Sequence, residues 1–135
     1  MKYVLDTNIL SFAMMGDESV LERLFALART NVLLPGPTLA EIEYGIARLP
    51  DSPRRNRLRR RLKSIVRNAG TAPWTRDVSQ AFGRIKAQLE ARGQRLEDFD
   101  VAIAAHALAS GAVLVTDNTT HMSRIPGLRL ENWRS

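Results

Sequence analysis

The sequence predicts an α/β fold with a central, mostly parallel sheet and helices on both of its faces. Short apolar runs that suit strands buried on both faces alternate along the chain with amphipathic helical patterns. Two of these runs, Tyr3–Leu5 and Leu114–Thr116, are each followed by an aspartate. Because open α/β sheets place their ligand sites at the carboxyl ends of parallel strands, these aspartates indicate where a functional site lies.

The elements of the first half follow from apolar spacing and turn residues. In order, they are a strand over residues 3–5, helices over 7–14 and 18–29, a buried strand over 32–34, and a helix from Thr38 to Pro50. The second strand is expected to stop at the Pro-Gly-Pro sequence of residues 35–37. Thr38 and Glu41 form a capping box, which is expected to begin the third helix.

The second half continues the alternation. In order, it holds a basic helix over residues 54–67, an edge strand over 71–74, a helix over 75–92, an alanine-rich helix over 98–110, a strand over 112–116, an irregular or briefly helical segment over 118–124, and a final strand over 128–133. The alanine-rich segment has little polar surface on any side, so it is expected to be buried and closely packed. The sheet therefore has four to five strands.

Length and composition favour one soluble, cytoplasmic domain. A chain of 135 residues can bury close to ~70% of its unfolded surface. It has no cysteine, which removes disulfides and thiolate metal sites and suits a reducing compartment. No apolar run approaches the ~20 residues that a membrane span needs. The 20 Lys and Arg against 14 Asp and Glu favour a polyanionic partner, because the arginine guanidinium matches the geometry of phosphate.

Several carboxylates are predicted to converge at the carboxyl edge of the sheet. Asp6 and Asp117 follow two strands, Asp100 opens the alanine-rich helix, and either Glu41 or Glu43 lies on a mostly apolar helix. Each alone is explained as a helix cap. Together they are not, because two carboxylates ~4 Å apart repel by about 4 kcal/mol at an effective dielectric of about 20. Oxygen ligands without cysteine or a histidine cluster suit Mg²⁺ or Mn²⁺.

Five segments then carry a resemblance to a known family. They are residues 3–8 (YVLDTN), 38–45 (TLAEIEYG), 98–107 (DFDVAIAAHA), 115–119 (VTDNT) and 125–133 (IPGLRLENW). In this order and at these separations they resemble a PIN-domain ribonuclease of the VapC type, the toxin half of a toxin–antitoxin pair. The resemblance runs nearly end to end, so it implies a single PIN domain over residues 1–135, folded as a PIN-like α/β/α sandwich.

The resemblance implies a Mg²⁺-dependent endoribonuclease, with Mn²⁺ as a substitute, in which a metal-activated water hydrolyses RNA to 3′-hydroxyl and 5′-phosphate ends. The implied catalytic metal ligands form an acidic quartet: Asp6, Glu41, Asp100 and Asp117. Glu43 is then expected to pair with an arginine or face solvent, and Asp98 to be the cap of its helix or to lie near the cap. Four neighbours are expected to support the ligands by hydrogen bonds, or to cap local helices in the case of the two asparagines: Thr7, Asn8, Thr116 and Asn118.

The basic helix over residues 54–67 is a candidate RNA-binding element. It carries eight Lys and Arg residues and spans about 21 Å, enough to follow several nucleotides of backbone. The side chains expected to point away from its apolar stripe are Arg57, Arg59, Arg60, Lys63 and Arg67. Reversing the charges of Arg59 and Lys63 is expected to weaken RNA binding and flatten its salt dependence. A merely solvated charged face is the alternative.

The resemblance also implies partners. The expected substrate is RNA, with initiator tRNA as the expectation. The expected protein partners are a cognate VapB-type antitoxin and a second copy of the chain, which forms a homodimer and is part of the hetero-oligomer. DNA is expected to be contacted only through the antitoxin, and no membrane is involved. The surface expected to receive the antitoxin is an apolar patch on the first helices that consists of Phe12, Met14 and Met15, alongside Leu24 and Phe25. Alternatively, these side chains belong to the core.

Three other functions compete with this interpretation. A metal-independent ribonuclease would use His106 and His121 as acid and base on the RNA 2′-hydroxyl, although His106 lies in the alanine-rich helix, where a packed histidine is expected. A haloacid-dehalogenase-type phosphatase would need a second aspartate where Asn8 stands. A non-catalytic basic domain that binds nucleic acid or a protein partner would leave the carboxylates unexplained.

Overall fold

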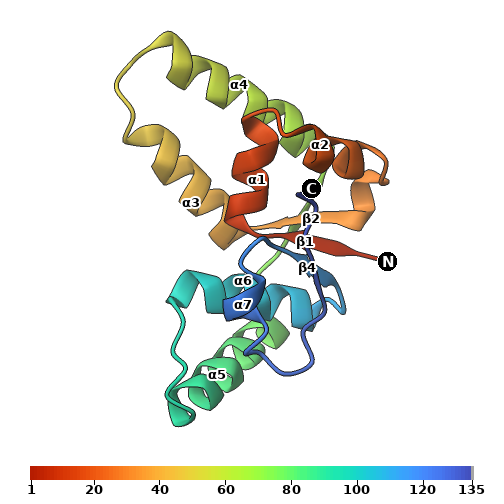
Figure 1. Cartoon of the computed structure of the whole chain (residues 1–135), viewed down its shortest axis with the longest axis vertical. Helices are drawn as coiled ribbons and strands as arrows, with labels where there is room; N and C mark the ends of the chain where they lie inside the picture. Colours follow the sequence, from red (N-terminus) through yellow and green to blue (C-terminus); the bar gives the residue numbers. More distant parts are fainter. Residues whose placement is uncertain (135) are drawn as a thin grey trace.

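The computed structural model describes residues 1–134, which form a five-stranded sheet with every pair of neighbouring strands parallel (Figure 1). The predicted α/β class is confirmed. The strand order is β3-β2-β1-β4-β5. The strands are β1 (Tyr3–Leu5), β2 (Val32–Pro35), β3 (Gly70–Ala72), β4 (Val113–Val115) and β5 (Leu130–Glu131). Among the described residues, no helix is long and apolar enough to cross a membrane.

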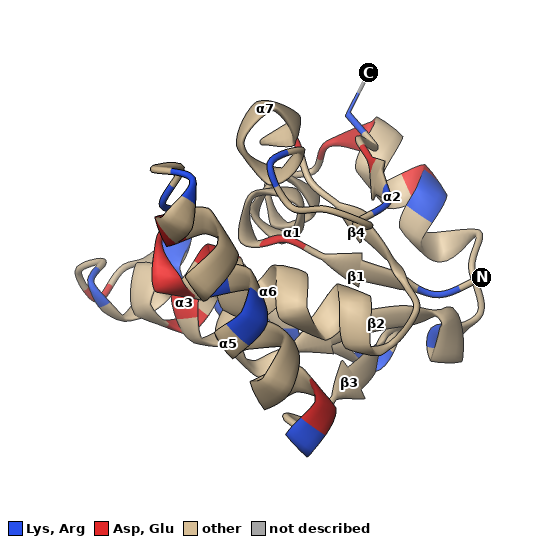
Figure 2. Cartoon of the chain, turned by 90° about the horizontal axis from the view of Figure 1, so that it is seen from below, with Lys and Arg blue, Asp and Glu red and all other residues tan. Residues whose placement is uncertain are grey.

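Helices cover both faces of the sheet, as predicted (Figures 1 and 2). They are α1 (Thr7–Met14), α2 (Glu18–Phe25), α3 (Gly36–Ala47), α4 (Pro53–Arg67), α5 (Arg76–Ala91), α6 (Asp98–Ala109) and α7 (Thr119–Met122), with a 3₁₀ turn η1 (Arg29–Asn31) before β2. In Figure 1, α3 and α4 form a hairpin at one end of the molecule, while α5, α6 and α7 lie at the other.

Alternate residues of the strands divide the interior into two cores. Leu5 and Val115 belong to the cluster that α1, α2, α3 and α4 cover, whereas Val4 and Leu114 belong to the cluster that α5, α6 and α7 cover. This is the period of two that a strand buried on both faces must show. The alanine-rich α6 is buried over almost its whole length, because its small side chains let it pack closely against both the sheet and α5.

The strand order places the expected site. The chain winds from β1 through β2 to β3 in one direction, while β4 and β5 lie on the other side of β1. The change of direction falls between β1 and β4, and open parallel sheets bind ligands in the crevice outside this switch point. Asp6 follows β1 and Asp117 comes two residues after β4, so both lie beside that crevice. A hydrogen bond from the Asp6 amide to the Val115 carbonyl, 2.9 Å long, joins the two strand ends.

Two predicted helix boundaries in the first half of the chain are wrong. The second helix ends at Phe25 rather than at residue 29, since Ala28 adopts an extended backbone conformation that leads through η1 into β2. The third helix begins at Gly36, with Pro37 in its first turn. A proline is tolerated there because its missing amide would have no partner within the helix.

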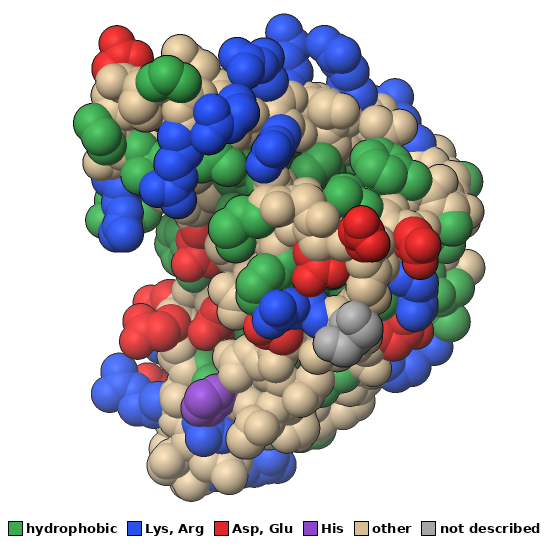
Figure 3. Space-filling model, turned by 45° about the horizontal axis from the view of Figure 1, so that its top comes forward, with side chains coloured by type: hydrophobic (Ala, Val, Ile, Leu, Met, Phe, Trp, Pro, Cys, Tyr) green, Lys and Arg blue, Asp and Glu red, His purple; other side chains and the backbone are tan. Residues whose placement is uncertain are grey.

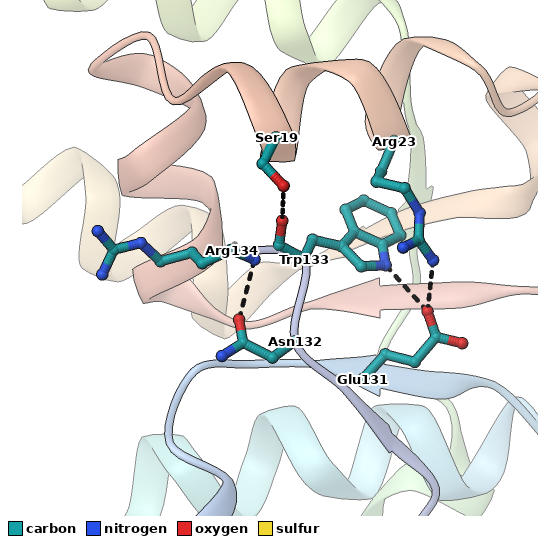
Figure 4. A network of polar contacts seen from close by, with 6 residues as sticks. All are labelled: Ser19, Arg23, Glu131, Asn132, Trp133 and Arg134. Carbon is teal, nitrogen blue, oxygen red and sulfur yellow. Dashed lines mark hydrogen bonds and ion pairs between the residues drawn. The ribbon is translucent and has the colours of Figure 1, made fainter.

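The C-terminal segment closes one side of the structure against α2 (Figure 4). Trp133 is 1% exposed, and its carbonyl accepts a 2.5 Å hydrogen bond from the Ser19 hydroxyl. Arg23 forms a 2.8 Å ion pair with Glu131 and lies 5.5 Å from the centre of the Trp133 ring. Arg134 lies over the ring of Phe12 at 3.7 Å. Residues 131–134 therefore fasten α1 and α2 to the edge of the sheet.

Candidate metal centre

Asp6 is held at the junction of β1 and α1. Its Oδ1 accepts a 2.8 Å hydrogen bond from the Thr7 amide, so Asp6 is the N-cap of α1. Its Oδ2 accepts a 2.7 Å hydrogen bond from the Thr116 hydroxyl. The side chain is 3% exposed. Asp6 therefore combines two roles, because one carboxylate oxygen caps the helix while the other is oriented toward the end of β4.

Glu41 is anchored to the same junction from α3. Its Oε1 accepts a 2.5 Å hydrogen bond from the Thr7 hydroxyl. The predicted capping box is wrong, because Thr38 lies inside the first turn of α3. The buried Thr38 hydroxyl instead donates to the Leu5 carbonyl at 2.8 Å. That bond ties α3 to the end of β1, one residue before Asp6, and so fixes the helix that carries Glu41.

Asp117 and Asp100 come from the second half of the chain. The Asn8 side-chain amide donates to Asp117 Oδ1 at 3.1 Å, so α1 holds a carboxylate that follows β4. Asp100 lies in the first turn of α6, where the helix macrodipole favours a negative charge. Asp98 is the first residue of this helix and so lies next to the cap position, the second of the two predicted possibilities. Glu97 is the N-cap residue, and Asp98 forms a 3.0 Å ion pair with Lys86.

The environment of Asp6 favours the protonated carboxyl. Burial, the largest effect, raises the pKa of Asp6 above its ordinary value. The hydrogen bonds from Thr116 and from the Thr7 amide lower it, while the negative charges of Glu41 and Asp117 raise it. A carboxylate with this balance is stabilised by a cation more than by water, because it is already desolvated.

Asp100 shows the same tendency. Burial, followed by the charges of Asp6, Glu41 and Glu97, raises the pKa of Asp100 from its ordinary 3.8 to about 6. Asp6 and Glu41 therefore act on Asp100 across the boundary between the two cores. In Figure 2, acidic positions lie at the carboxyl end of β1 and on α3, on the side toward which the strands run.

The four carboxylates fit a hard divalent cation by their chemistry. All the donor atoms are oxygens, and the partners already share one electrostatic environment. As the side chains lie, no group of three or more His, Cys, Asp or Glu among residues 1–134 is gathered closely enough to hold an ion. This spacing is compatible with Mg²⁺, which keeps several waters and takes only one or two carboxylates directly.

The other candidate residues are accounted for locally. Glu43 lies 3.9 Å from Arg59, with both side chains about half exposed, as expected for a carboxylate outside the site. The Asn118 Oδ1 lies 2.6 Å from His121 Nδ1. Asn118 is the N-cap residue of α7, but the Asn118 side chain makes no capping hydrogen bond to that helix. Thr7 and Thr116 each donate to a carboxylate of the predicted quartet.

The two histidines are not equally accessible. His121 is exposed, whereas His106 is 1% exposed and packs edge-on against Trp74 with the ring centres 5.4 Å apart. Burial lowers the pKa of His106, which keeps the ring neutral. An acid–base pair that acts on RNA would need both rings at the substrate, so the burial of His106 counts against the histidine mechanism.

The apolar patch predicted on the first helices is only partly on the surface. Met14 and Leu24 are 4% and 0% exposed and belong to the core, so for these two residues the alternative prediction, burial in the core, is confirmed. Met15 and Phe25 remain 58% and 51% exposed. Phe25 borders a hollow of about 210 Å³ between α1, α2 and α4.

Two grooves flank the carboxylates. The first, of about 460 Å³, lies between α1, α3 and α4 and reaches Thr7, Asn8 and Glu41. The second, of about 690 Å³, lies beside α6 and α7 and reaches Asp100. Figure 3 shows acidic side chains on the walls of a notch, with Lys and Arg side chains gathered over the part of the molecule that α4 forms.

Some residues of the first groove were not predicted from the sequence. Of the five predicted RNA-binding side chains, only Arg57 lines it; the other arginines on its walls are Arg48, Arg54 and Arg61. Helical spacing could have shown that Arg54, Arg57 and Arg61 share one flank of α4. It could not have shown which flank faces α3.

Comparisons with known proteins agree with this arrangement. A family model for the PIN domain matches residues 3–128. The chain is 32% identical over 135 residues to Ribonuclease VapC2 of Rickettsia felis, and 31% identical over 133 residues to the tRNA(fMet)-specific endonuclease VapC of Shigella flexneri; each comparison covers 98% of both chains.

Solved structures show the same likeness. VapBC2 from Rickettsia felis, bound to a DNA fragment from its promoter, contains a chain with a TM-score of 0.88 and 31% identity, and the match covers 98% of this chain and 99% of that one. A chain of DNA-bound VapBC from Salmonella typhimurium has a TM-score of 0.87 and 30% identity, with 98% of each chain covered.

These matches identify the family of the chain and its type within that family. The chain belongs to the PIN-domain family, since the family model spans nearly its whole length. Within that family it is of the VapC type, because its relatives of 30% identity or more over almost the complete chain are VapC proteins. Both steps of the predicted resemblance are confirmed.

Proposed function

We propose that the chain is a Mg²⁺-dependent endoribonuclease and the toxin of a VapBC-type toxin–antitoxin pair. The observation that supports the proposal is electrostatic: Glu41 and Asp117 act on Asp6, and Asp6 and Glu41 act on Asp100, beside the switch point of the sheet, and the pKa values of Asp6 and Asp100 are raised. The similarity to proteins named ribonuclease or endonuclease supports RNA as the substrate.

Asp6 and Asp100 would hold the cation most directly, because they are the carboxylates that burial and neighbouring charges destabilise when no cation is bound. Glu41 and Asp117 would complete the site directly or through waters. When bound, Mg²⁺ lowers the pKa of the attacking water and offsets negative charge that builds up on the phosphodiester. Mn²⁺, which also prefers oxygen ligands, is expected to substitute.

The protein's own contribution is to orient the ligands. Thr116 fixes one oxygen of Asp6, and Thr7 fixes one oxygen of Glu41. The Asn8 amide holds Asp117 from the opposite strand end. These hydrogen bonds reduce the number of side-chain rotamers that must be frozen when the substrate complex forms. No side chain of the chain needs to serve as a nucleophile.

The proposal is tested by RNA cleavage with matched variants. We expect wild-type activity to be abolished by EDTA and restored by Mg²⁺ or Mn²⁺, and Glu41→Gln to lose at least ~100-fold in rate. Glu43→Gln lies on the same helix, pairs with Arg59 at the surface, and should retain activity. Products should carry 3′-hydroxyl and 5′-phosphate ends. Activity that survives EDTA, or 2′,3′-cyclic phosphate ends, would refute the metal mechanism.

The partners are part of the same proposal. Two relatives of known structure are VapBC complexes bound to DNA, which supports a VapB-type antitoxin as the protein partner. Contact with DNA through that antitoxin and a homodimer within the hetero-oligomer belong to the same proposal. Exposed Met15 and Phe25 offer apolar surface for the antitoxin. Initiator tRNA is the proposed substrate, because a relative is named a tRNA(fMet)-specific endonuclease. Purified RNA from expressing cells, mapped at its new ends, identifies the cleaved molecule.

A further inference from the structure

The groove between α1, α3 and α4 gathers arginines without carboxylate partners. Arg48, Arg54, Arg57 and Arg61 all line it. Among residues 1–134, none of the four lies within 4.0 Å of a carboxylate oxygen. Arg61 is fixed by a 2.9 Å hydrogen bond to the Met14 carbonyl. Like charges around one groove repel, so a bound anion would stabilise this arrangement.

The position of Arg54 at the N-terminal end of α4 also favours a bound anion in this groove. Arg54 lies in the first turn of α4, which has no acidic residue. The helix macrodipole disfavours a cation at that end, where Ser52 supplies the capping oxygen. An arginine placed against the dipole and without an ion partner is poorly explained by folding alone.

The second groove is different in charge. Two of its cations are paired with carboxylates, since Lys86 lies 3.0 Å from Asp98 and Arg95 lies 4.0 Å from Glu90. Glu97 also lines that groove. The net attraction for a polyanion is therefore concentrated on the side of α3 and α4.

We propose that the first groove, here called the arginine groove, binds the sugar-phosphate backbone of the RNA strand on one side of the cleaved bond. The assignment rests on the proposed ribonuclease function. Arg54 and Arg61 are separated by about 10 Å along α4, a distance that spans more than one phosphate of a nucleic-acid strand. The groove ends at Thr7 and Glu41, so a strand that follows the arginines arrives at the carboxylates.

The floor of the groove has room for the strand. A Cβ atom added at Gly45 would meet no atom within 4 Å, and Gly45 lines the groove one turn after Glu41. A large side chain there would occupy the path of the RNA. It would not strain the helix, because most residues form an α-helix more readily than glycine does.

The basic side chains of α4 outside the arginine groove are assigned a smaller role. Arg59 lies beside Glu43 at 3.9 Å, and Arg60 and Lys63 do not line the arginine groove. The RNA-binding side chains that helical spacing predicted on α4 are therefore replaced, apart from Arg57, by those that line the arginine groove.

The test compares double variants that remove the same charge. Binding of a fluorescein-labelled 12-nucleotide single-stranded RNA to the full chain is measured by anisotropy at several NaCl concentrations, without divalent cation. Arg54→Gln with Arg57→Gln should weaken binding about 10- to 30-fold at 0.1 M NaCl and lower the slope of log K against log [NaCl] by about 1.4. Arg84→Gln with Arg92→Gln, one exposed position on α5 and the exposed C-cap residue of that helix, should leave both the affinity and the slope unchanged.

Two further measurements can overturn the assignment. A loss for Arg60→Gln with Lys63→Gln as large as that for the groove pair would assign RNA to the surface of α4 outside the arginine groove. A 12-residue poly-glutamate peptide that binds more tightly than the RNA, and loses affinity in the groove pair, would make the groove a protein-binding site.

Gly45→Tyr provides a test that does not depend on charge. It should weaken RNA binding while the free energy of unfolding stays equal to or above that of the wild type, and unchanged RNA binding would refute the assigned path. Because binding is measured without cleavage, a groove that binds RNA in a protein that does not cut it would refute the proposed function and leave this inference standing.

Discussion

Asp100 should make the metal-free protein less stable than it would be with a neutral side chain. Its pKa is raised from 3.8 to about 6 by burial and by the charges of Asp6, Glu41 and Glu97. A difference of about 2 pKa units corresponds to about 3 kcal/mol. Because Asp100 is only half-buried, solvent screening reduces the expected cost to about 1–2 kcal/mol.

The pH dependence follows from the direction of the shift. Below pH 3.8 the carboxyl is protonated in both the folded and the unfolded state, so it costs no stability. Between pH 3.8 and about 6 the folded state retains a proton that the unfolded state has lost, so stability falls as pH rises. Above about pH 6 the full cost is present. Asp100→Asn should therefore raise the free energy of unfolding at pH 7.5 and leave it nearly unchanged at pH 3.5.

The assay is urea unfolding in EDTA at both pH values, repeated with 10 mM Mg²⁺. Added Mg²⁺ should stabilise the wild type and have less effect on Asp100→Asn, since only a folded site binds the ion. Asp98→Asn is the matched control, because Asp98 lies on the same helical turn but pairs with Lys86 at the surface; it should gain no stability. An equal gain for Asp100→Asn at both pH values would show that like-charge repulsion and burial are not its cause.

Two further predictions concern the scaffold. Thr38→Val should lower the free energy of unfolding by about 1–2 kcal/mol in urea titrations, because the buried Leu5 carbonyl loses its hydroxyl donor. Thr38→Ser keeps a hydroxyl and should recover most of the loss. An unchanged free energy of unfolding in Thr38→Val would show that the hydrogen bond contributes nothing. Trp133→Ala should lower the free energy of unfolding by about 3–5 kcal/mol, because a fully buried aromatic side chain is removed. A decrease of less than ~1 kcal/mol in the same titrations would show that residues near the C-terminus are not packed in solution.

The sheet was predictable because its strands are buried on both faces. Continuous apolar runs ended by polar residues marked β1, β2 and β4 to within one or two residues. The edge strands were less accurate: β3 begins one residue before the predicted segment, and β5 covers only Leu130–Glu131 of the predicted 128–133. An edge strand pairs on one side only, so its length depends on its neighbour more than on its own sequence.

The candidate site was predictable as a set of residue types and less so as a set of contacts. Spacing along the chain indicated that Asp6 and Asp117 lie together, but Glu41 and Glu43 could not be separated by periodicity. The structure distinguishes their environments, because Thr7 donates to Glu41 while Glu43 lies beside Arg59. The role of Thr38 was also hidden, since its partner Leu5 lies 33 residues away in the sequence.

The position of the carboxylates between two cores gives the cation a mechanical role in the proposed site. Asp6 and Glu41 extend from elements that enclose one core, and Asp100 from a helix that encloses the other. Their mutual repulsion therefore acts across the sheet boundary, and α3 and α6 bear it. A divalent ion would replace that repulsion with attraction and draw the two halves together. Metal binding should then make α3 more rigid, and with it the arginine groove that α3 lines. The metal site and the path of the RNA strand that leads to it would therefore both become ordered when the metal binds.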